Sequence, residues 1–358
     1  MGYLRNAWYV AAWADSIGDT LLPRTIIDES VVVFRDAMGE AKVIGDTCPH
    51  RFAPLHRGTR CSDGTVACPY HGLRFNGAGQ CVHNPHGDGK IPQAARVQSY
   101  PVVEKYNFVW VWMGDSAKAD ASAIPNFSFV SDGSLATVKG EVLGNGNYEL
   151  YSDNILDLGH AEFLHAGGLG SPAFTKNPRE IYQDGAQVWS NIASLNDYLP
   201  PLPGLMKELE GERKDWWVDV RWDPPASMEL TMYVSEVGGT RASARWIDRA
   251  LHIMTPEAPN RTRYFWAFSR NYRVEDKALS EQIRQGLSIA FDIEDKPMIE
   301  AQELAMKGRG FWELGPVLLN GDAGGVRARR VLAELITCQE RSQVGEGAQR
   351  GTTQRAGT

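Results

Sequence analysis

The sequence predicts an α+β protein of two domains. Residues 1–115 are expected to form an all-β domain, and residues 116–342 a domain that combines an antiparallel sheet with helices. Two observations predict this class. Short β-branched and aromatic runs alternate with turn residues in the first third of the chain, whereas strands and helical stretches are mixed in the rest. The length of 358 residues allows two or three domains of ordinary size.

The first domain is expected to be a small sandwich of antiparallel strands. Its strand candidates are residues 30–34, 42–44 and 108–112, which are rich in Val, Ile, Phe and Trp. The Gly-rich stretch 76–90 is predicted to be a surface loop, and residues 116–126 are predicted to connect the two domains.

The second domain contains strand candidates at 216–220 and 263–268 and helical stretches near 150–165, 276–308 and 325–340. From residue 343 the chain turns to Gly, Gln, Thr and Arg without apolar periodicity. Residues 343–358 are therefore predicted to be a disordered tail.

The composition restricts the possible partners. A net charge of −7 and a pI near 5.7 argue against binding to nucleic acid or to an anionic membrane, because both need a basic surface. No apolar stretch reaches the ~18 residues that a membrane-spanning helix requires. The five Cys residues do not suggest a disulfide framework, and the first residues lack the apolar core of a signal peptide. A cytoplasmic protein is expected.

Four residues in the first domain form the most specific motif of the chain. Cys48 and His50 are separated by seventeen intervening residues from Cys68 and His71, which gives the pattern C-x-H…C-x-x-H. Two thiolates and two imidazoles on paired loops are the ligands of a Rieske [2Fe–2S] cluster, in which Cys residues hold one iron and His residues the other. A structural zinc site is the alternative, but zinc modules usually pair Cys with Cys and His with His.

A second constellation lies in the helical stretch near residue 155. Asp153, Asp157 and His160 are spaced i, i+4, i+7 and would share one face of a regular helix. For His165 to meet the same ion as His160, the helix must widen or break after Gly159.

Two His and one carboxylate on one side of an ion form the facial triad of Fe(II) oxygenases, which leaves positions open for O2 and substrate. The carboxylate could be Asp153, Asp157 or an acid from the distant run 292–295, and spacing alone does not choose among them. Two ordinary helix histidines in a salt-bridged helix remain the alternative to a metal site.

With these motifs the chain resembles the Rieske non-haem iron oxygenases over nearly its whole length. It is most similar to the branch of vanillate and dicamba O-demethylases and toluenesulfonate methyl-monooxygenase. The supporting segments are CPHR at 48–51, CPYHGL at 68–73, DLGH at 157–160 and TPE at 255–257. The resemblance implies an all-β Rieske domain, a helix-grip-like antiparallel sheet with helices, a [2Fe–2S] cluster and a mononuclear Fe(II).

The resemblance also implies roles for individual residues. The cluster ligands would be Cys48, His50, Cys68 and His71, and the iron ligands would be His160, His165 and Asp295. Asp157 would bridge an iron-bound His to a cluster His of a neighbouring subunit, which makes a head-to-tail homotrimer the expected assembly. Asn154 would lie close to the iron.

Substrate recognition is expected to involve His252, since the dicamba-type enzyme places a carboxylate-binding His at this position; a core histidine is the alternative. The polar amide partner of that enzyme corresponds here to Leu230, or to Thr231 if the register shifts by one. The run 198–206 is either a lid over the substrate or an inert Pro-rich loop.

The predicted function is that of a terminal oxygenase that hydroxylates a methyl group of an aromatic substrate. O-demethylation of a methoxy-aromatic acid with release of formaldehyde is favoured. The resemblance implies that electrons come from a separate flavin- and ferredoxin-type reductase that uses NAD(P)H. No dinucleotide fingerprint follows a predicted strand, so NADH binding is not assigned to this chain. The alternatives are N-dealkylation, hydroxylation of an aryl methyl group, and an electron carrier without oxygenase activity.

Overall fold

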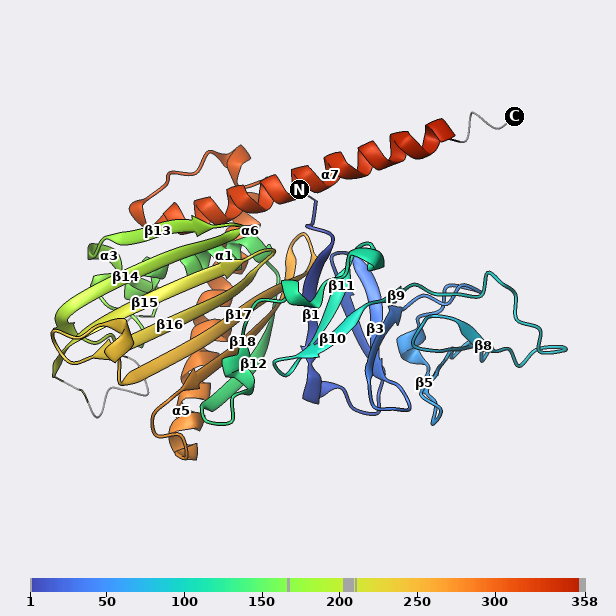
Figure 1. Cartoon of the computed structure of the whole chain (residues 1–358), viewed down its shortest axis with the longest axis horizontal. Coiled ribbons are helices and arrows are strands. Elements are labelled where there is room, and N and C mark those ends of the chain that lie inside the picture. The colour runs from blue at the N-terminus through green and yellow to red at the C-terminus, as the bar shows by residue number, and fades with distance from the viewer. Residues whose placement is uncertain (1, 166–167, 202–208, 210, 354–358) are drawn as a thin grey trace.

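The structure is a computed structural model that describes residues 2–165, 168–201, 209 and 211–353. Two lobes lie side by side, and the chain passes from one to the other between β11 (Phe108–Met113) and β12 (Ala136–Gly144) (Figure 1). The antiparallel sheets and the helices of the second lobe confirm the predicted α+β class.

The first lobe consists of small antiparallel sheets. One has the order β1 (Ala7–Trp13), β11, β10 (Val102–Lys105). A second has the order β2 (Leu22–Ile26), β3 (Glu29–Arg35), β4 (Ala41–Gly45), β9 (Ser99–Tyr100). The third has the order β5 (Thr59–Arg60), β6 (Val66–Ala67), β7 (Arg74–Phe75), β8 (Cys81–His83), and it forms the tip farthest from the second lobe (Figure 1).

Strands β1 and β11 are buried on both faces because they lie between two cores. The alternating positions Tyr9, Ala11 and Val111 pack against the β2–β4 sheet. The intervening positions, such as Val10 and Trp110, pack against the second lobe. The period-2 alternation of a strand therefore joins the two lobes through one apolar interface.

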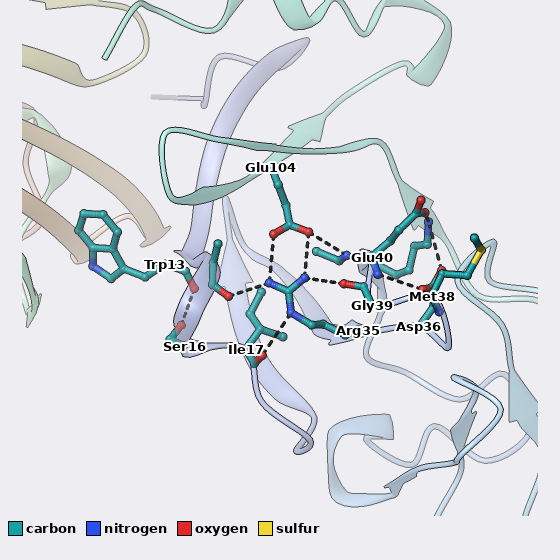
Figure 2. A network of polar contacts seen from close by, with 12 residues as sticks. Trp13, Ser16, Ile17, Arg35, Asp36, Met38, Gly39, Glu40 and Glu104 are labelled. Carbon is teal, nitrogen blue, oxygen red and sulfur yellow. Dashed lines mark hydrogen bonds and ion pairs between the residues drawn. The ribbon is translucent and has the colours of Figure 1, made fainter. Parts of the chain in front are cut away.

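Arg35, whose side chain is partly buried, joins two sheets of the first lobe. Figure 2 shows Arg35 of β3 donating two hydrogen bonds of 3.0 Å to the carboxylate of Glu104 on β10. The same guanidinium also donates to the carbonyl oxygens of Ala14 and Gly39 at 2.8 and 2.7 Å. Bidentate Arg–carboxylate pairs are directional, so this network fixes the β2–β4 sheet against the β1–β11–β10 sheet.

The second lobe contains an antiparallel sheet of seven strands. Their order is β12, β18 (Arg261–Arg270), β17 (Trp246–Ala258), β16 (Ser227–Ser235), β15 (Arg213–Asp223), β14 (Gln187–Tyr198), β13 (Arg179–Asp184). The predicted strands 216–220 and 263–268 fall within β15 and β18.

The helices of this lobe cover one face of the sheet, while its other face packs against the first lobe (Figure 1). Their bounds are α1 (Tyr148–Leu156), α2 (Ala161–Leu164), α3 (Ala173–Lys176), α5 (Lys277–Ser288), the π-helix η8 (Ile289–Asp295), α6 (Lys296–Met306) and α7 (Ala323–Thr353). The short 3-10 turns are η1 (Ala14–Ser16), η2 (Leu55–Arg57), η3 (Ser116–Lys118), η4 (Ala121–Ala123), η5 (Ser128–Ser131), η6 (Leu158–His160), η7 (Arg241–Ser243), η9 (Trp312–Leu314) and η10 (Asn320–Asp322).

Helix α7 continues to Thr353 and so includes part of the stretch 343–358. The disordered tail expected for that stretch stays a prediction. The packed part of α7 contains Val331 and Leu332, which belong to the core. Extending an existing helix avoids the cost of nucleation, so a polar segment without apolar periodicity continues α7 beyond its packed part. Within the described residues, no helix is long and apolar enough to cross a membrane.

Candidate metal centres

The two tip loops that carry the Cys–His pairs have the same backbone hydrogen bonds. The N–H of Phe52 donates to the carbonyl of Cys48 at 2.9 Å, and the N–H of Gly72 donates to the carbonyl of Cys68 at 3.1 Å. Both donors have positive φ, 60° at Phe52 and 71° at Gly72. The two loops therefore reverse direction in the same way and present their Cys and His side chains toward each other.

The donor set of these loops fits a Rieske cluster. Cys48 and Cys68 are buried, and their thiols lie within hydrogen-bonding distance of each other. Burial raises the pKa of Cys48, and the neighbouring Cys68 thiol adds to this, so a thiolate here needs a cation beside it. The rings of His50 and His71 lie 4.4 Å apart between centroids, and His71 Nδ1 is buried with no partner among the described residues.

The segment just before His160 departs from the predicted helix. Helix α1 ends at Leu156, and Asp157 is extended, with φ −111° and ψ 95°. The Asp157 carboxylate accepts the N–H of Gly159 at 3.0 Å and so caps the next turn, η6. The prediction of a break after Gly159 is therefore wrong by two residues, because an Asp side chain competes for backbone N–H groups and favours a cap.

The break also separates the residues that were expected to share one helix face. Asp153 pairs instead with Arg329, whose Nε and Nη2 donate to its Oδ2 at 2.8 and 2.7 Å. Burial raises the pKa of Asp153 to about 6, although the Arg329 charge opposes this shift. Asp153 is thus engaged elsewhere and is not the third member of the triad.

The structure brings His160, His165 and Asp295 together. One ligand atom from each side chain lies within 4.8 Å of the other two. Asp295 Oδ1 lies 3.5 Å from His160 Nε2 and 3.3 Å from His165 Nε2. The amide of Asn154 donates to the same oxygen at 2.9 Å. This arrangement of two imidazoles and one carboxylate on one side of a common point fits the facial triad of Fe(II) sites.

Asp295 reaches the histidines because it ends a π-helix. Residues 289–295 form η8 between α5 and α6, and Asp295 is buried there. A widened or broken helix was expected at the histidines, but the π-helix lies in the segment of the acid. π-bulges frequently mark functional sites because they re-aim side chains that a regular helix would turn away.

Each histidine faces Asp295 with Nε2 and is held in place through Nδ1. His165 Nδ1 lies 2.6 Å from Glu294 Oε2, and His160 Nδ1 lies 2.6 Å from the backbone carbonyl of Asp157. A carbonyl only accepts, so His160 must carry its proton on Nδ1, which leaves Nε2 to face Asp295. Glu294 was not predicted to take part in the site, and the one sequence signal for it is its place beside Asp295 in the acidic run.

Asp157 contacts His160 only through its backbone within the described chain. Its carboxylate oxygen Oδ1 accepts instead from Arg179 Nη2 at 3.0 Å and from Gly159 N–H. A cavity of about 500 Å³ opens beside this carboxylate and is also lined by His160, Asn154 and Asp322.

His252 is buried on the helix-facing side of the sheet. Its Nδ1 lies 2.6 Å from the hydroxyl of Tyr264, and its Nε2 is buried with no partner in the described part of the chain. The ring of Phe291 packs at 5.8 Å. Burial lowers the pKa of His252 to about 3, so the imidazole is neutral, and the charge of Asp295 acts on it in the opposite direction.

The strand register decides between Leu230 and Thr231. Leu230 pairs with Ala250, two residues from His252 on the same strand, and therefore lies on the same face as His252. Thr231 points to the other face, where its hydroxyl donates to Glu229 at 3.0 Å. The alternative with Thr231 is therefore wrong. Most of the predicted lid 198–206 lies outside the described residues.

Comparisons with known proteins agree with this geometry. Residues 7–101 match the Rieske [2Fe-2S] domain, and residues 145–337 match the vanillate O-demethylase oxygenase C-terminal domain. The chain is 36% identical over 349 residues to the oxygenase component of chloroacetanilide N-alkylformylase from Rhizorhabdus wittichii, which covers 96% of this chain and 98% of that protein.

The chain is also 36% identical to the oxygenase component of dicamba O-demethylase from Stenotrophomonas maltophilia, over 94% of this chain and 98% of that protein. The crystal structure of dicamba monooxygenase bound to dicamba superimposes with a TM-score of 0.87 at 35% identity, covering 95% of this chain and 100% of that one. These findings define the class as an oxygenase with a Rieske domain. The chain belongs to the Rieske non-haem iron oxygenases and is an oxygenase component of that family.

Proposed function

We propose that this oxygenase component removes a methyl or other alkyl group from the oxygen of an aromatic substrate, with a methoxy-aromatic acid as the first candidate. The observation that carries the proposal is the convergence of His160, His165 and Asp295 near a buried histidine surrounded by aromatic rings. Such a site can hold a redox-active iron on one side and a flat substrate on the other.

Bound iron at this triad would supply reductive activation of O2 and hydroxylation of the alkyl carbon. For a methoxy group, one oxygen atom of O2 forms the new C–O bond, and two electrons and two protons convert the other oxygen to water. The resulting hemiacetal collapses to a phenol and formaldehyde.

The side chains of this protein would position both components. His160, His165 and Asp295 would hold Fe(II), while the Asn154 amide would orient the Asp295 carboxylate. His252 would offer its unpartnered Nε2 to a polar group of the substrate, and Tyr264 and Phe291 would pack against the aromatic ring.

A second candidate is N-dealkylation of an uncharged anilide. Leu230 supports this reading, because it places an apolar side chain on the same face as His252, where a second polar group would help to hold a carboxylate. The similarity to chloroacetanilide N-alkylformylase supports it as well. The triad itself does not distinguish O-dealkylation from N-dealkylation.

The electron route favours a head-to-tail homotrimer. The cluster tip with β5 and β8 is the part of the first lobe farthest from the second lobe, which contains α1 (Figure 1), so a cluster from a second copy would have to approach the iron. Phe52 and Tyr70 expose 77% and 65% of their surface at the tip, and Phe163 and Ile293 expose 74% and 67% beside the iron site. Exposed apolar side chains at both places suit contacts between copies. A separate reductase would reduce the cluster.

The test is a screen of methoxy-, N-alkyl- and methyl-arenes with purified protein and a surrogate reductase. Formaldehyde release coupled to NADH consumption and abolished by His160→Ala, with the cluster absorbance of that variant intact, is the expected result. Electron transfer to the protein without oxygenated product from any compound would instead support an electron carrier. Products from methoxybenzoates or from N-alkyl anilides would decide between the two candidates.

A further inference from the structure

The carboxylate of Asp157 is held at three points, although it lies at the edge of an open cavity. Its side chain is 33% exposed. One oxygen, Oδ1, accepts from the N–H of Gly159 and from Nη2 of Arg179, both at 3.0 Å. Among the described residues, no donor reaches the other oxygen, Oδ2.

Arg179 comes from an element distant in sequence from the iron-site helices. It is the first residue of β13, the edge strand of the sheet, and only 8% of its side chain is exposed. The same Nη2 also donates to the carbonyl of Phe174 at 3.1 Å. The carbonyl of Phe174 therefore holds the same guanidinium nitrogen that donates to the Asp157 carboxylate.

Gly321 packs against the Asp157 carboxylate and is the third residue that restricts it. A Cβ at this position would lie 2.5 Å from Asp157 Oδ1 and 3.3 Å from Oδ2, so only a residue without a side chain lets η10 pack on the carboxylate. Rotation of the carboxylate away from Arg179 is thus opposed by backbone as well as by hydrogen bonds. Of the two carboxylate oxygens, Oδ1 already accepts two hydrogen bonds, and Oδ2 can accept one from a further donor.

The backbone of the same residue holds the iron-site histidine. The carbonyl of Asp157 accepts from His160 Nδ1 at 2.6 Å. Arg179, Asp157 and His160 therefore form one connected series, in which the arginine fixes the carboxylate and the carbonyl of the same residue fixes the imidazole. The bond to the imidazole belongs to the backbone, so loss of Arg179 would release the carboxylate and leave His160 held.

The charges around the cavity also indicate that Arg179 matters for the Asp157 carboxylate. The cavity contains Asp153, Asp157 and Asp322. Arg329 compensates Asp153, and Arg179 compensates Asp157 and interacts with Asp322. Without Arg179 the mouth of the cavity would carry an uncompensated carboxylate, which would repel an approaching electron donor of negative charge.

We propose that Arg179 is a positioning residue for electron delivery: it aims Asp157 so that Oδ2 can accept a hydrogen bond from a cluster histidine of a second copy. This inference rests on the proposed bridging role of Asp157. It adds a residue outside both metal motifs and states which carboxylate oxygen makes the contact between copies.

The test compares Arg179→Gln, Arg179→Lys and Asp157→Asn in the fully metallated protein. The enzyme is first reduced, and the excess reductant is removed. It is then mixed with O2 and a compound from the screen that the unsubstituted enzyme oxidises, and reoxidation of the cluster is followed by its absorbance. Arg179→Gln should slow this step at least tenfold with unchanged iron and sulfide content. Arg179→Lys, which keeps the charge but loses the planar fork, should fall between.

Arg221→Gln is the matched control for folding. It removes a guanidinium that is 13% exposed and paired with Asp223 at 2.8 Å on the other face of the sheet, and it should leave the rate unchanged. Fe(II) affinity of each variant, measured by anaerobic titration, provides a readout independent of turnover and should change less than threefold.

Reoxidation of Arg179→Gln within twofold of the unsubstituted protein, while Asp157→Asn is slow, would overturn the role of Arg179 and leave the bridge standing. Normal rates in both variants would reject the bridge and, with it, this inference. Formaldehyde from the unsubstituted enzyme reports on the proposed function separately from either result. A slow Arg221→Gln variant would also overturn the inference, since loss of any buried arginine would then suffice.

Discussion

Replacement of Glu294 by Ala is expected to weaken Fe(II) binding by roughly 5- to 30-fold. Glu294 Oε2 lies 2.6 Å from His165 Nδ1 and holds the ring that faces Asp295. A hydrogen bond to a charged group contributes about 1.5–3 kcal/mol. Because the Glu294 side chain is 35% exposed, water screens part of this energy, and we take about 1–2 kcal/mol. At 1.4 kcal/mol for each factor of ten, this range gives the stated loss.

The assay is an anaerobic titration of iron-depleted protein with Fe(II) against a competing chelator. Glu294→Gln keeps an acceptor for the His165 proton and loses only the charge, so its loss should be smaller than that of Glu294→Ala. Asp292→Ala, which removes another acid from the same π-helix, serves as the control. Binding by Glu294→Ala within twofold of the unsubstituted protein would refute the reasoning, because His165 would then need no carboxylate to hold it.

Two further predictions concern stability. Burial raises the pKa of Asp248 to about 7 from an ordinary value of 3.8, so the folded state retains a proton that the unfolded state has lost. The contribution of Asp248 to the free energy of unfolding should therefore be complete below pH 4 and be lost as the pH rises through about 7. In chemical denaturation at a series of pH values, the difference between the unsubstituted protein and Asp248→Asn should change with pH in this way, and a constant difference would contradict the assignment. Gly140→Ala would place a Cβ 2.2 Å from the Trp266 ring, so a cost of about 1–3 kcal/mol is expected. In thermal denaturation, Gly18→Ala, which meets no atom within 4 Å, should be neutral, and an equally neutral Gly140→Ala would show that the ring can move aside.

The residues that the sequence located best are those whose partners are close in the chain. The loops of Cys48 and Cys68 are short turns set by local hydrogen bonds, so spacing alone indicated their chemistry. The strands at 108–112 and 263–268 were visible as aromatic and β-branched runs. The break in α1 was misplaced because it depends on whether one side chain, Asp157, captures the N–H of Gly159 or leaves it to the helix.

Other features depend on contacts between distant segments. Glu294 lies 129 residues from His165, and Arg329 lies 176 residues from Asp153, so spacing on one helix could not show that Asp153 was engaged elsewhere. Strand pairing excluded Thr231, because a shift of one residue moves a side chain to the opposite face.

By itself the sequence determined the family, and it predicted the kinds of ligands and two domains, since donor atoms and hydrophobic periods are properties of local chain chemistry. The tertiary structure decided which carboxylate meets His160 and His165, which partner holds each imidazole, and which oxygen of Asp157 is free. These choices depend on the relative positions of α1, η8, β13 and η10, which only the packed sheet and helices fix.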